Sequence, residues 1–226
     1  MKVLSVNVGR PTKVAYTSQA QGLTGIDKRP VTHPVMVSPP GPMRIGGSGL
    51  AGDAVCDRRY HGGNEQAVYA YAREDLDAWG RELGRTLDDG AFGENLTTVG
   101  IDVSHTLVGE RWRVGEQLVL EATSGRVPCR TFAGWIGEEG WVRRFTQRAL
   151  TGAYFRVIEP GEIRTGDTVE ILHRPAHGIS VDLQFRAVTT DRSLLPRLLE
   201  AGDALHPEAR EKAQAYIAKY GAGTAG

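Results

Sequence analysis

Cys129 is the residue with the clearest potential for chemistry, because two arginines lie close to it in the sequence. It lies between Arg126 and Arg130 in the segment SGRVPCR, directly after a strand-like run at residues 117–123. A glycine ends that run with a turn, and Pro128 keeps the following residues extended. The sequence therefore predicts a thiol presented from a shaped loop, where positive charge favours the thiolate that attacks electrophiles or binds soft metals. A free cysteine that serves only as a small buried apolar side chain explains the segment equally well.

A second segment, RRYHGG, combines basic side chains with two glycines. Its arginines offer planar forks for phosphate or carboxylate, and the N–H groups of its glycines can approach an anion closely. An ordinary loop with solvated charges would have the same composition. The candidate anion ligands are Arg58, Arg59, His61, Gly62 and Gly63.

Asn95, in the segment FGENLT, is a third candidate. Its amide could contact a polar ring edge, or it could close a turn. Cys56, His61 and Cys129 are suitable zinc ligands by type, but no CxxC or HxxxH spacing supports a zinc site. Cys129 and His61 could also form a nucleophilic dyad, provided that the fold brings them together.

The charge balance, the number of cysteines and the length of the apolar stretches each disfavour certain classes of protein. The 226 residues carry 27 basic and 27 acidic side chains, a balance that disfavours nucleic acid or an anionic membrane as the main partner. Two cysteines do not make a disulfide framework, although one bridge is compatible with the sequence. The N-terminal MKVLSVNV is typical of a strand, not of a signal peptide, and no apolar stretch approaches 18 residues. We therefore expect a cytoplasmic protein.

The spacing of apolar and turn-forming residues along the chain predicts a mainly β fold with inserted helices. Short apolar runs separated by Gly, Pro, Asp and Asn are typical of a closed or nearly closed β-barrel. The expected strands include residues 3–8, 31–37, 67–71, 111–114, 118–120, 154–158 and 168–172. Apolar residues spaced three and four apart predict helices at residues 73–83 and 138–150.

The C-terminal part is expected to form three short helices. Ser180 and Asp191 are suitable N-caps for the first two, and Pro207 suits the first turn of the third. We therefore expect a barrel domain at residues 1–175 and a helical accessory module with a frayed tail at 176–226. Such short helices bury too little apolar surface to be very stable alone, so they should pack on the barrel.

Several short motifs occur in an order that resembles MOSC domains, which are named after the C-terminal domain of molybdenum cofactor sulfurase. The chain looks like the stand-alone, YiiM-like bacterial branch of that family, and the resemblance covers nearly the whole chain. The motifs are Gly52-Asp53, Asp57, the His61-Gly62-Gly63 block, Ala67-Val68-Tyr69, Phe92-Gly93-Glu94-Asn95-Leu96 and Arg126-x-Pro128-Cys129.

This resemblance implies a MOSC-type β-barrel that binds a molybdopterin-type molybdenum cofactor. Cys129 would be both the molybdenum ligand and the catalytic residue, which suits a soft thiolate. Arg58, Arg59, His61, Gly62 and Gly63 would hold the cofactor phosphate. Asn95 would contact the pterin, and Arg126 and Arg130 would offset cofactor charge and keep the thiol ionised.

The resemblance also implies an enzyme that reduces N-hydroxylated compounds, such as hydroxylamines and N-hydroxylated bases, to amines. The cofactor would carry the redox chemistry, and electrons would come from a separate reductase, either a flavoprotein or an iron–sulfur protein. One alternative is a sulfur carrier that passes a Cys129 persulfide to a metal or cofactor acceptor. Another is a non-enzymatic cofactor carrier. The oligomeric state stays open.

Overall fold

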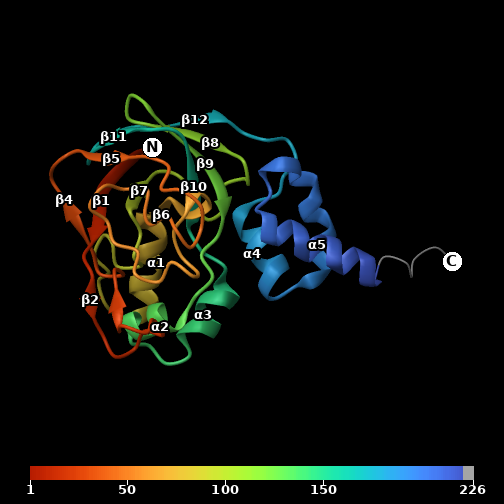
Figure 1. The fold of residues 1–226 in the computed structure, drawn as a ribbon, viewed down its shortest axis with the longest axis horizontal. Coiled ribbons are helices and arrows are strands. Elements are labelled where there is room, and N and C mark those ends of the chain that lie inside the picture. The colour runs from red at the N-terminus through yellow and green to blue at the C-terminus, as the bar shows by residue number, and fades with distance from the viewer. Residues whose placement is uncertain (221–226) are drawn as a thin grey trace.

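The computed structural model describes residues 1–220 and contains one large, mostly antiparallel sheet (Figure 1). Its eight strands follow the order β12–β8–β9–β10–β6–β7–β1–β4, and β6 and β7 pair in parallel. These strands are β1 (Lys2–Gly9), β4 (Lys28–Val31), β6 (Val68–Ala72), β7 (Leu96–Val99), β8 (Arg111–Val114), β9 (Leu118–Ser124), β10 (Ala153–Glu159) and β12 (Val169–His173). The short apolar runs of the sequence therefore do form strands.

The sheet does not close, so of the expected closed or nearly closed β-barrel the closed form is wrong. Strands β12 and β4 are the two ends of the sheet order. The start of β1 reaches the turn before β12 through a bridge between Lys2 and Thr168 and through backbone hydrogen bonds such as Val3 N to Asp167 O at 2.9 Å. Pro30 contributes to the open edge, because a proline in the short strand β4 has no N–H to donate to a further strand.

Two small sheets complete the strand content. The predicted strand at residues 31–37 is split: β4 ends at Val31, and the following Pro34 cannot continue a hydrogen-bonded ladder. The small sheets pair β5 (Val35–Val37) with β11 (Gly161–Ile163) and β2 (Thr12–Lys13) with β3 (Leu23–Thr24).

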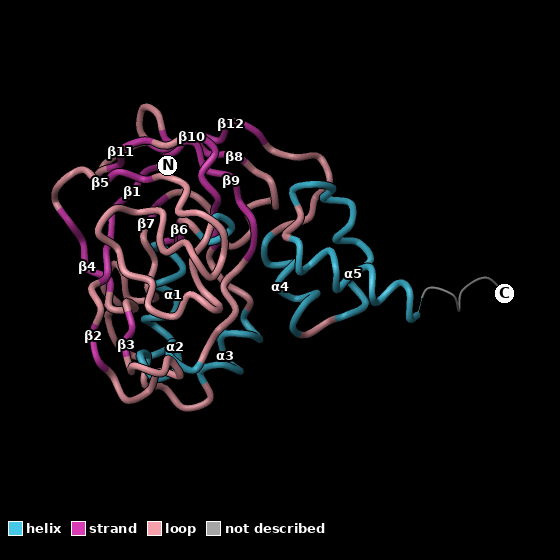
Figure 2. The backbone as a smooth tube through the Cα atoms, viewed as in Figure 1, coloured by secondary structure: helices cyan, strands magenta, loops and turns pink. Residues whose placement is uncertain are grey.

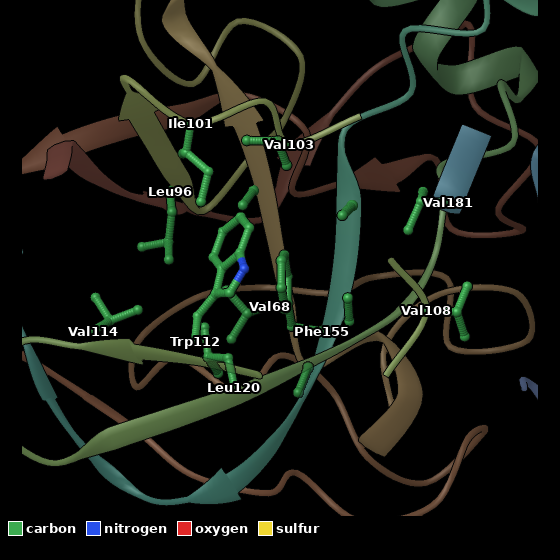
Figure 3. Close-up of a cluster of buried hydrophobic side chains, with 14 of the residues drawn as sticks. Val68, Leu96, Ile101, Val103, Val108, Trp112, Val114, Leu120, Phe155 and Val181 are labelled. Carbon is green, nitrogen blue, oxygen red and sulfur yellow. The ribbon is translucent and has the colours of Figure 1, made fainter. Parts of the chain in front are cut away.

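The main core is aliphatic with a few aromatic rings. Figure 3 shows the Trp112 ring among side chains from several strands, and its Nε1 donates to Glu110 Oε1 at 2.8 Å. This hydrogen bond lets the indole be fully buried without an unpaired donor. Other labelled members are Val68, Leu96, Ile101, Val103, Val108, Val114, Leu120, Phe155 and Val181.

A second, aromatic core lies beneath three helices. These are α1 (Arg73–Leu83), α2 (Arg130–Ile136) and α3 (Trp141–Arg148). The helix predicted at residues 73–83 is confirmed, and Leu76 and Trp79 are its buried face. The predicted helix at residues 138–150 is shorter, and α2 was not expected. The rings in this core include Trp79, Phe92, Phe132, Trp141 and Phe145.

After β12 the chain enters what we call the C-terminal helical segment, residues 181–220. Figures 1 and 2 show it at one end of the molecule, with α4 (Val181–Thr189) next to the sheet and α5 (Pro207–Tyr220) beyond it. The Ser180 side chain caps α4 as predicted, accepting from the Leu183 N–H. The Val181 N–H donates to Thr106 O at 2.9 Å, which ties the segment to the body of the protein.

The predicted second helix is a run of 3₁₀ turns, η2 (Arg192–Ala204), and not an α-helix. Pro196 lies inside it and Gly202 breaks it with non-helical dihedrals, which explains why a regular α-helix does not form. Within residues 1–220, no helix combines the length and the apolar character that crossing a membrane requires. The expected frayed tail lies outside the described residues.

Candidate functional site

A cavity of about 610 Å³ brings most of the candidate residues together. It lies between the large sheet with its connecting loops and the C-terminal helical segment, and residues from both line it. From the sequence candidates it is lined by Cys56, Arg59, His61, Gly62, Asn95, Arg126 and Cys129. Arg58, Gly63 and Arg130 are not part of the lining.

Cys129 is a half-buried thiol at the start of a helix. The residue is the N-cap of α2, with its backbone O accepting from Ala133 N at 2.9 Å. Burial raises the pKa of the thiol, but the interactions with His61 and with the charge of Arg126 lower it and outweigh burial. The resulting pKa is about 6, so the thiolate predominates at neutral pH. His61 and Cys129 line the same cavity, as the alternative of a nucleophilic dyad requires, and the dyad itself stays a prediction.

Cys56 lines the same cavity but is a different kind of thiol. Its pKa is raised, chiefly by burial, although the charges of Lys28 and Arg58 act in the opposite direction. Both cysteines are free, so no bridge joins them. The cavity thus holds one ionised thiol and one neutral thiol.

Arg126 is a buried guanidinium without a carboxylate partner among the ion pairs of residues 1–220. Its Nη1 donates to Phe92 O, and its guanidinium carbon lies 4.1 Å from the Phe132 ring centre and 5.3 Å from that of Tyr69. Its Nε is buried and has no hydrogen-bond partner. A buried donor costs stability when it is left unpaired, and a charged one costs more. This arrangement suits an anion that the cavity would receive.

The predicted anion segment reaches the cavity in part. Arg59 lines it and forms a fork with Asp57, with Nε–Oδ1 at 2.8 Å and Nη2–Oδ2 at 2.9 Å. These hydrogen bonds lower the pKa of Asp57. Arg58 instead donates to Ile45 O at 3.1 Å and is exposed outside the cavity. The two neighbouring arginines therefore have different environments.

Both glycines of the His-Gly-Gly block allow a close approach of neighbouring backbone, and one of them also lines the cavity. Gly62 and Gly63 have φ of 80° and 76°, a region that favours glycine. A Cβ on Gly62 would lie 2.5 Å from Gly47 O, and one on Gly63 would lie 2.7 Å from the Met43 Cα. The Gly63 N–H donates to Gly47 O at 3.0 Å and is not free for an anion. Of the pair, Gly62 is the one on the cavity wall.

Asn95 is held by the protein itself. Its Oδ1 accepts from Tyr69 N at 3.1 Å, and its Nδ2 donates to Asp53 Oδ2 at 2.9 Å and to Asn7 O at 3.3 Å. The amide is therefore engaged on both ends, although the residue lines the cavity. The geometry gives Asn95 the task of fixing Asp53, and the predicted pterin contact stays a prediction.

Asp53 and Lys28 form a buried ion pair on the cavity wall. Asp53 Oδ1 also accepts from Gly9 N at 2.7 Å. Burial lowers the pKa of Lys28, while Asp53 acts to raise it. Lys28 was missed in the sequence because DKRP is typical of a solvated loop. Only the tertiary structure places its ammonium group beside Asp53.

Glu94 braces the loop that precedes β7. The carboxylate is fully buried and accepts from Gly90 N at 2.6 Å, Phe92 N at 2.9 Å and Thr97 Oγ1 at 2.8 Å. Burial raises its pKa to about 7, against the effect of these hydrogen bonds. Phe92 O in turn accepts from Arg126. Glu94 thus fixes the loop that orients the guanidinium beside Cys129.

Within residues 1–220, no group of three or more His, Cys, Asp or Glu side chains is arranged to hold a metal ion. The zinc option for Cys56, His61 and Cys129 therefore receives no support. Arg130 is exposed at the first residue of α2 and does not reach the cavity. Arg130 was expected to offset the charge of the ligand, but it makes no contact with the cavity that would support this role.

Comparisons with known proteins agree on one family. A model described as the MOSC domain matches residues 57–170. The uncharacterized protein YflK of Bacillus subtilis (strain 168) is 35% identical over 184 residues, which cover 81% of this chain and 79% of YflK. A Gibberella moniliformis protein named Reductase is 30% identical over 138 residues, which cover 60% of this chain but 24% of that protein.

The fold comparison covers nearly the whole chain. The crystal structure of YiiM from Geobacillus stearothermophilus matches with a TM-score of 0.75 and 26% identity, covering 96% of this chain and 98% of that one. The chain belongs to the MOSC domain family. Within that family it is similar to YiiM proteins, and the match to the Geobacillus stearothermophilus structure covers 96% of this chain.

Proposed function

We propose that the chain binds a molybdenum cofactor in the cavity and reduces N-hydroxylated compounds to amines. MOSC-family membership is compatible with cofactor binding, and the relative named Reductase supports an oxidoreductase type of activity. The observation that carries the proposal is the juxtaposition of two groups. Arg126 supplies a buried charge with an unpartnered Nε, and Cys129 supplies a thiol with a pKa of about 6.

The residues present fit such a cofactor. A molybdopterin-type ligand is anionic and needs a soft ligand for its metal, and the cavity offers a thiolate beside a guanidinium that no described carboxylate pairs. Cys129 would ligate the metal, while Arg126, Arg59 and the Gly62 N–H would hold anionic groups. When bound, the cofactor supplies the two-electron redox chemistry that side chains cannot perform.

The overall reaction balances when a separate reductase supplies two electrons and the solvent supplies two protons. R–NHOH takes up two electrons and two protons, the N–O bond breaks, and R–NH₂ and water leave. His61 is the group best placed to hold or deliver a proton near the thiol, because it lines the same cavity and acts to lower the pKa of Cys129. The electrons would come from a separate reductase, a flavoprotein or an iron–sulfur protein.

The test is molybdenum and pterin quantification on protein from a host that makes the cofactor. We expect wild type and Cys56→Ser to carry both. Cys129→Ser is expected to lose molybdenum or turnover, with an unchanged circular dichroism spectrum. Cys56 is the matched control because it lines the same cavity with a raised pKa. Absence of molybdenum from wild type, or loss in Cys56→Ser alone, would overturn the proposal.

A sulfur carrier is the second candidate, and the low pKa of Cys129 favours it too. Mass spectrometry distinguishes the two functions. A carrier would hold one added sulfur atom on Cys129 after incubation with a cysteine desulfurase and would pass it to an acceptor. Under the reductase proposal, reduction of a hydroxylamine depends on molybdenum and proceeds without any desulfurase.

A further inference from the structure

The start of α5 forms part of the cavity wall and lies outside the segment that the family model matches. The MOSC match ends at residue 170, whereas α5 begins at Pro207. The residue before the helix and three residues of its first two turns line the cavity: His206, Glu208, Ala209 and Lys212. A displacement of this helix start would therefore open one side of the cavity.

The His206 side chain caps α5 with a ring nitrogen. Its Nδ1 accepts from Glu208 N at 3.3 Å, and its backbone O accepts from Ala209 N at 3.0 Å and from Arg210 N at 3.1 Å. The first N–H groups of a helix have no partner within the helix, so such acceptors hold its first turn in place. A ring nitrogen accepts only when it carries no proton, and a charged imidazole has two donors and no acceptor. The side-chain cap therefore requires neutral His206.

A positive charge on His206 would also be unfavourable for electrostatic reasons. The N-terminal end of a helix carries partial positive charge, which repels a cation. The charged groups that face the imidazole are Glu65 and Arg156 from the body of the protein and Glu208 and Lys212 from α5. Burial lowers the pKa of His206, Glu65 and Glu208 act to raise it, and Arg156 and Lys212 act to lower it. Because the pKa is lowered overall, the neutral form that caps α5 predominates at pH 7.

Arg156 attaches the turn that leads into α5 to the large sheet. Its Nη2 donates to Ala204 O at 3.2 Å, and the same guanidinium pairs with Glu65 and Glu121. Gly202, with non-helical dihedrals, separates this turn from the preceding 3₁₀ turns. Residues 203–208 are thus bounded by a glycine on one side and by the capped helix start on the other. A proton on His206 would act on this short segment directly, since it adds a like charge beside Arg156.

We infer that His206 is a pH-sensitive latch on the cavity wall. Neutral His206 caps α5 and keeps the helix start against the cavity, whereas protonation removes the cap and loosens residues 203–213. Because the pKa of this imidazole is lowered in the closed state, the open state binds a proton more readily, and acidification below about pH 6.5 favours opening. The latch controls access to the cavity whichever ligand the cavity binds, so it does not rest on the proposed function.

Hydrogen exchange of the full chain at pH 7.5 and at pH 5.5 tests the latch, with rates corrected for the pH dependence of intrinsic exchange. In wild type, peptides covering residues 207–213 should lose about three- to tenfold of their protection at the lower pH, since protonation of an ordinary imidazole in the open state favours opening by up to about tenfold over this range. His206→Asn keeps an uncharged capping side chain and should show no such loss. His33→Asn is the matched control, because His33 is exposed and outside the cavity lining, and it should respond as wild type does.

A second readout measures access to the cavity. In a Cys56→Ser background, Cys129 is modified with N-ethylmaleimide and with the bulkier N-(1-pyrenyl)maleimide, and the ratio of the two rate constants cancels the ionisation of the thiol. The relative rate of the bulkier reagent should rise from pH 7.5 to pH 5.5 when His206 is present and stay constant in His206→Asn.

Two results would overturn the latch. One is protection of residues 207–213 that does not change with pH in wild type, and the other is an equal loss of protection in wild type and His206→Asn. Loss of the pH response in His33→Asn would likewise count against His206 as its source. Absence of molybdenum or of any reduction would instead sink the proposed function and leave these measurements unaffected, because they need no cofactor.

Discussion

The guanidinium carbon of Arg126 lies 4.1 Å from the centre of the Phe132 ring. Because Phe132 is in the first turn of α2, this contact holds Arg126 against the helix that begins after Cys129. Aromatic faces and the Phe92 carbonyl oxygen surround the charge, and no described carboxylate pairs with it. The positive charge is therefore available both to the thiol and to an anionic ligand.

Replacement of Arg126 should weaken the thiolate. Arg126→Met removes one of the positive charges that lower the pKa of Cys129, so the pKa should rise toward the ordinary thiol range. The rate of iodoacetamide modification at pH 7, measured in a Cys56→Ser background, should fall by a factor of about 3–10. Arg126→Lys keeps the charge and should retain most of the rate. An unchanged rate in Arg126→Met would show that His61 alone maintains the thiolate.

The two cysteines should titrate in different pH ranges. Alkylation of Cys129, followed in Cys56→Ser, should be half-maximal near pH 6, because the His61 and Arg126 interactions outweigh burial. Alkylation of Cys56, followed in Cys129→Ser, should become fast only above the ordinary thiol range, because burial raises its pKa. Coincident profiles would contradict the distinction between the two thiols.

The same shift makes stability depend on pH. The folded-state pKa of Cys129 is lower than that of an unfolded thiol, roughly 8.5, so ionised Cys129 stabilises the folded protein. This contribution is complete above the unfolded pKa and disappears as the pH falls through about 6. The difference in free energy of unfolding between wild type and Cys129→Ser should therefore grow from pH 6 to pH 8.5. Urea titrations along this range measure it.

Lys28 and Asp53 should be strongly coupled. Lys28→Met leaves a buried carboxylate unpaired and should cost roughly 3–5 kcal/mol in urea unfolding, as breaking a buried ion pair does. Lys28→Met combined with Asp53→Asn should cost less than the sum of the two single changes, because neither charge is then left alone. Additive effects would show that the pair contributes little through its mutual contact.

Arg59 and Arg58 provide a matched pair for anion binding. Arg59→Ala should weaken phosphate or cofactor retention, because Arg59 lines the cavity and offers a planar fork to an anion. Arg58→Ala should have little effect, because its side chain donates to Ile45 O outside the cavity. Phosphate titration by NMR and cofactor content measure the two effects. Equal losses in both variants would assign the effect to the overall charge of the loop.

The sequence by itself determined the features that depend on neighbouring residues. Local periodicity predicted β1 and α1, and Ser180 indicated the start of α4, because strand pleating, helical spacing and capping act over a few residues. The order of short motifs identified the family and singled out Cys129. The order of the motifs can be read from the sequence, although the sequence does not show how the motifs are placed in space.

Only the tertiary structure decided which of these residues meet. Arg126 came to the cavity whereas Arg130, four positions later, stayed exposed at the start of α2. The sheet remained open because its edge strands β4 and β12 do not pair with each other. Gln66 and Gln184, far apart in the chain, line one cavity. Burial, ion pairing and thiol ionisation depend on what surrounds a group in space, and sequence spacing alone does not specify those surroundings.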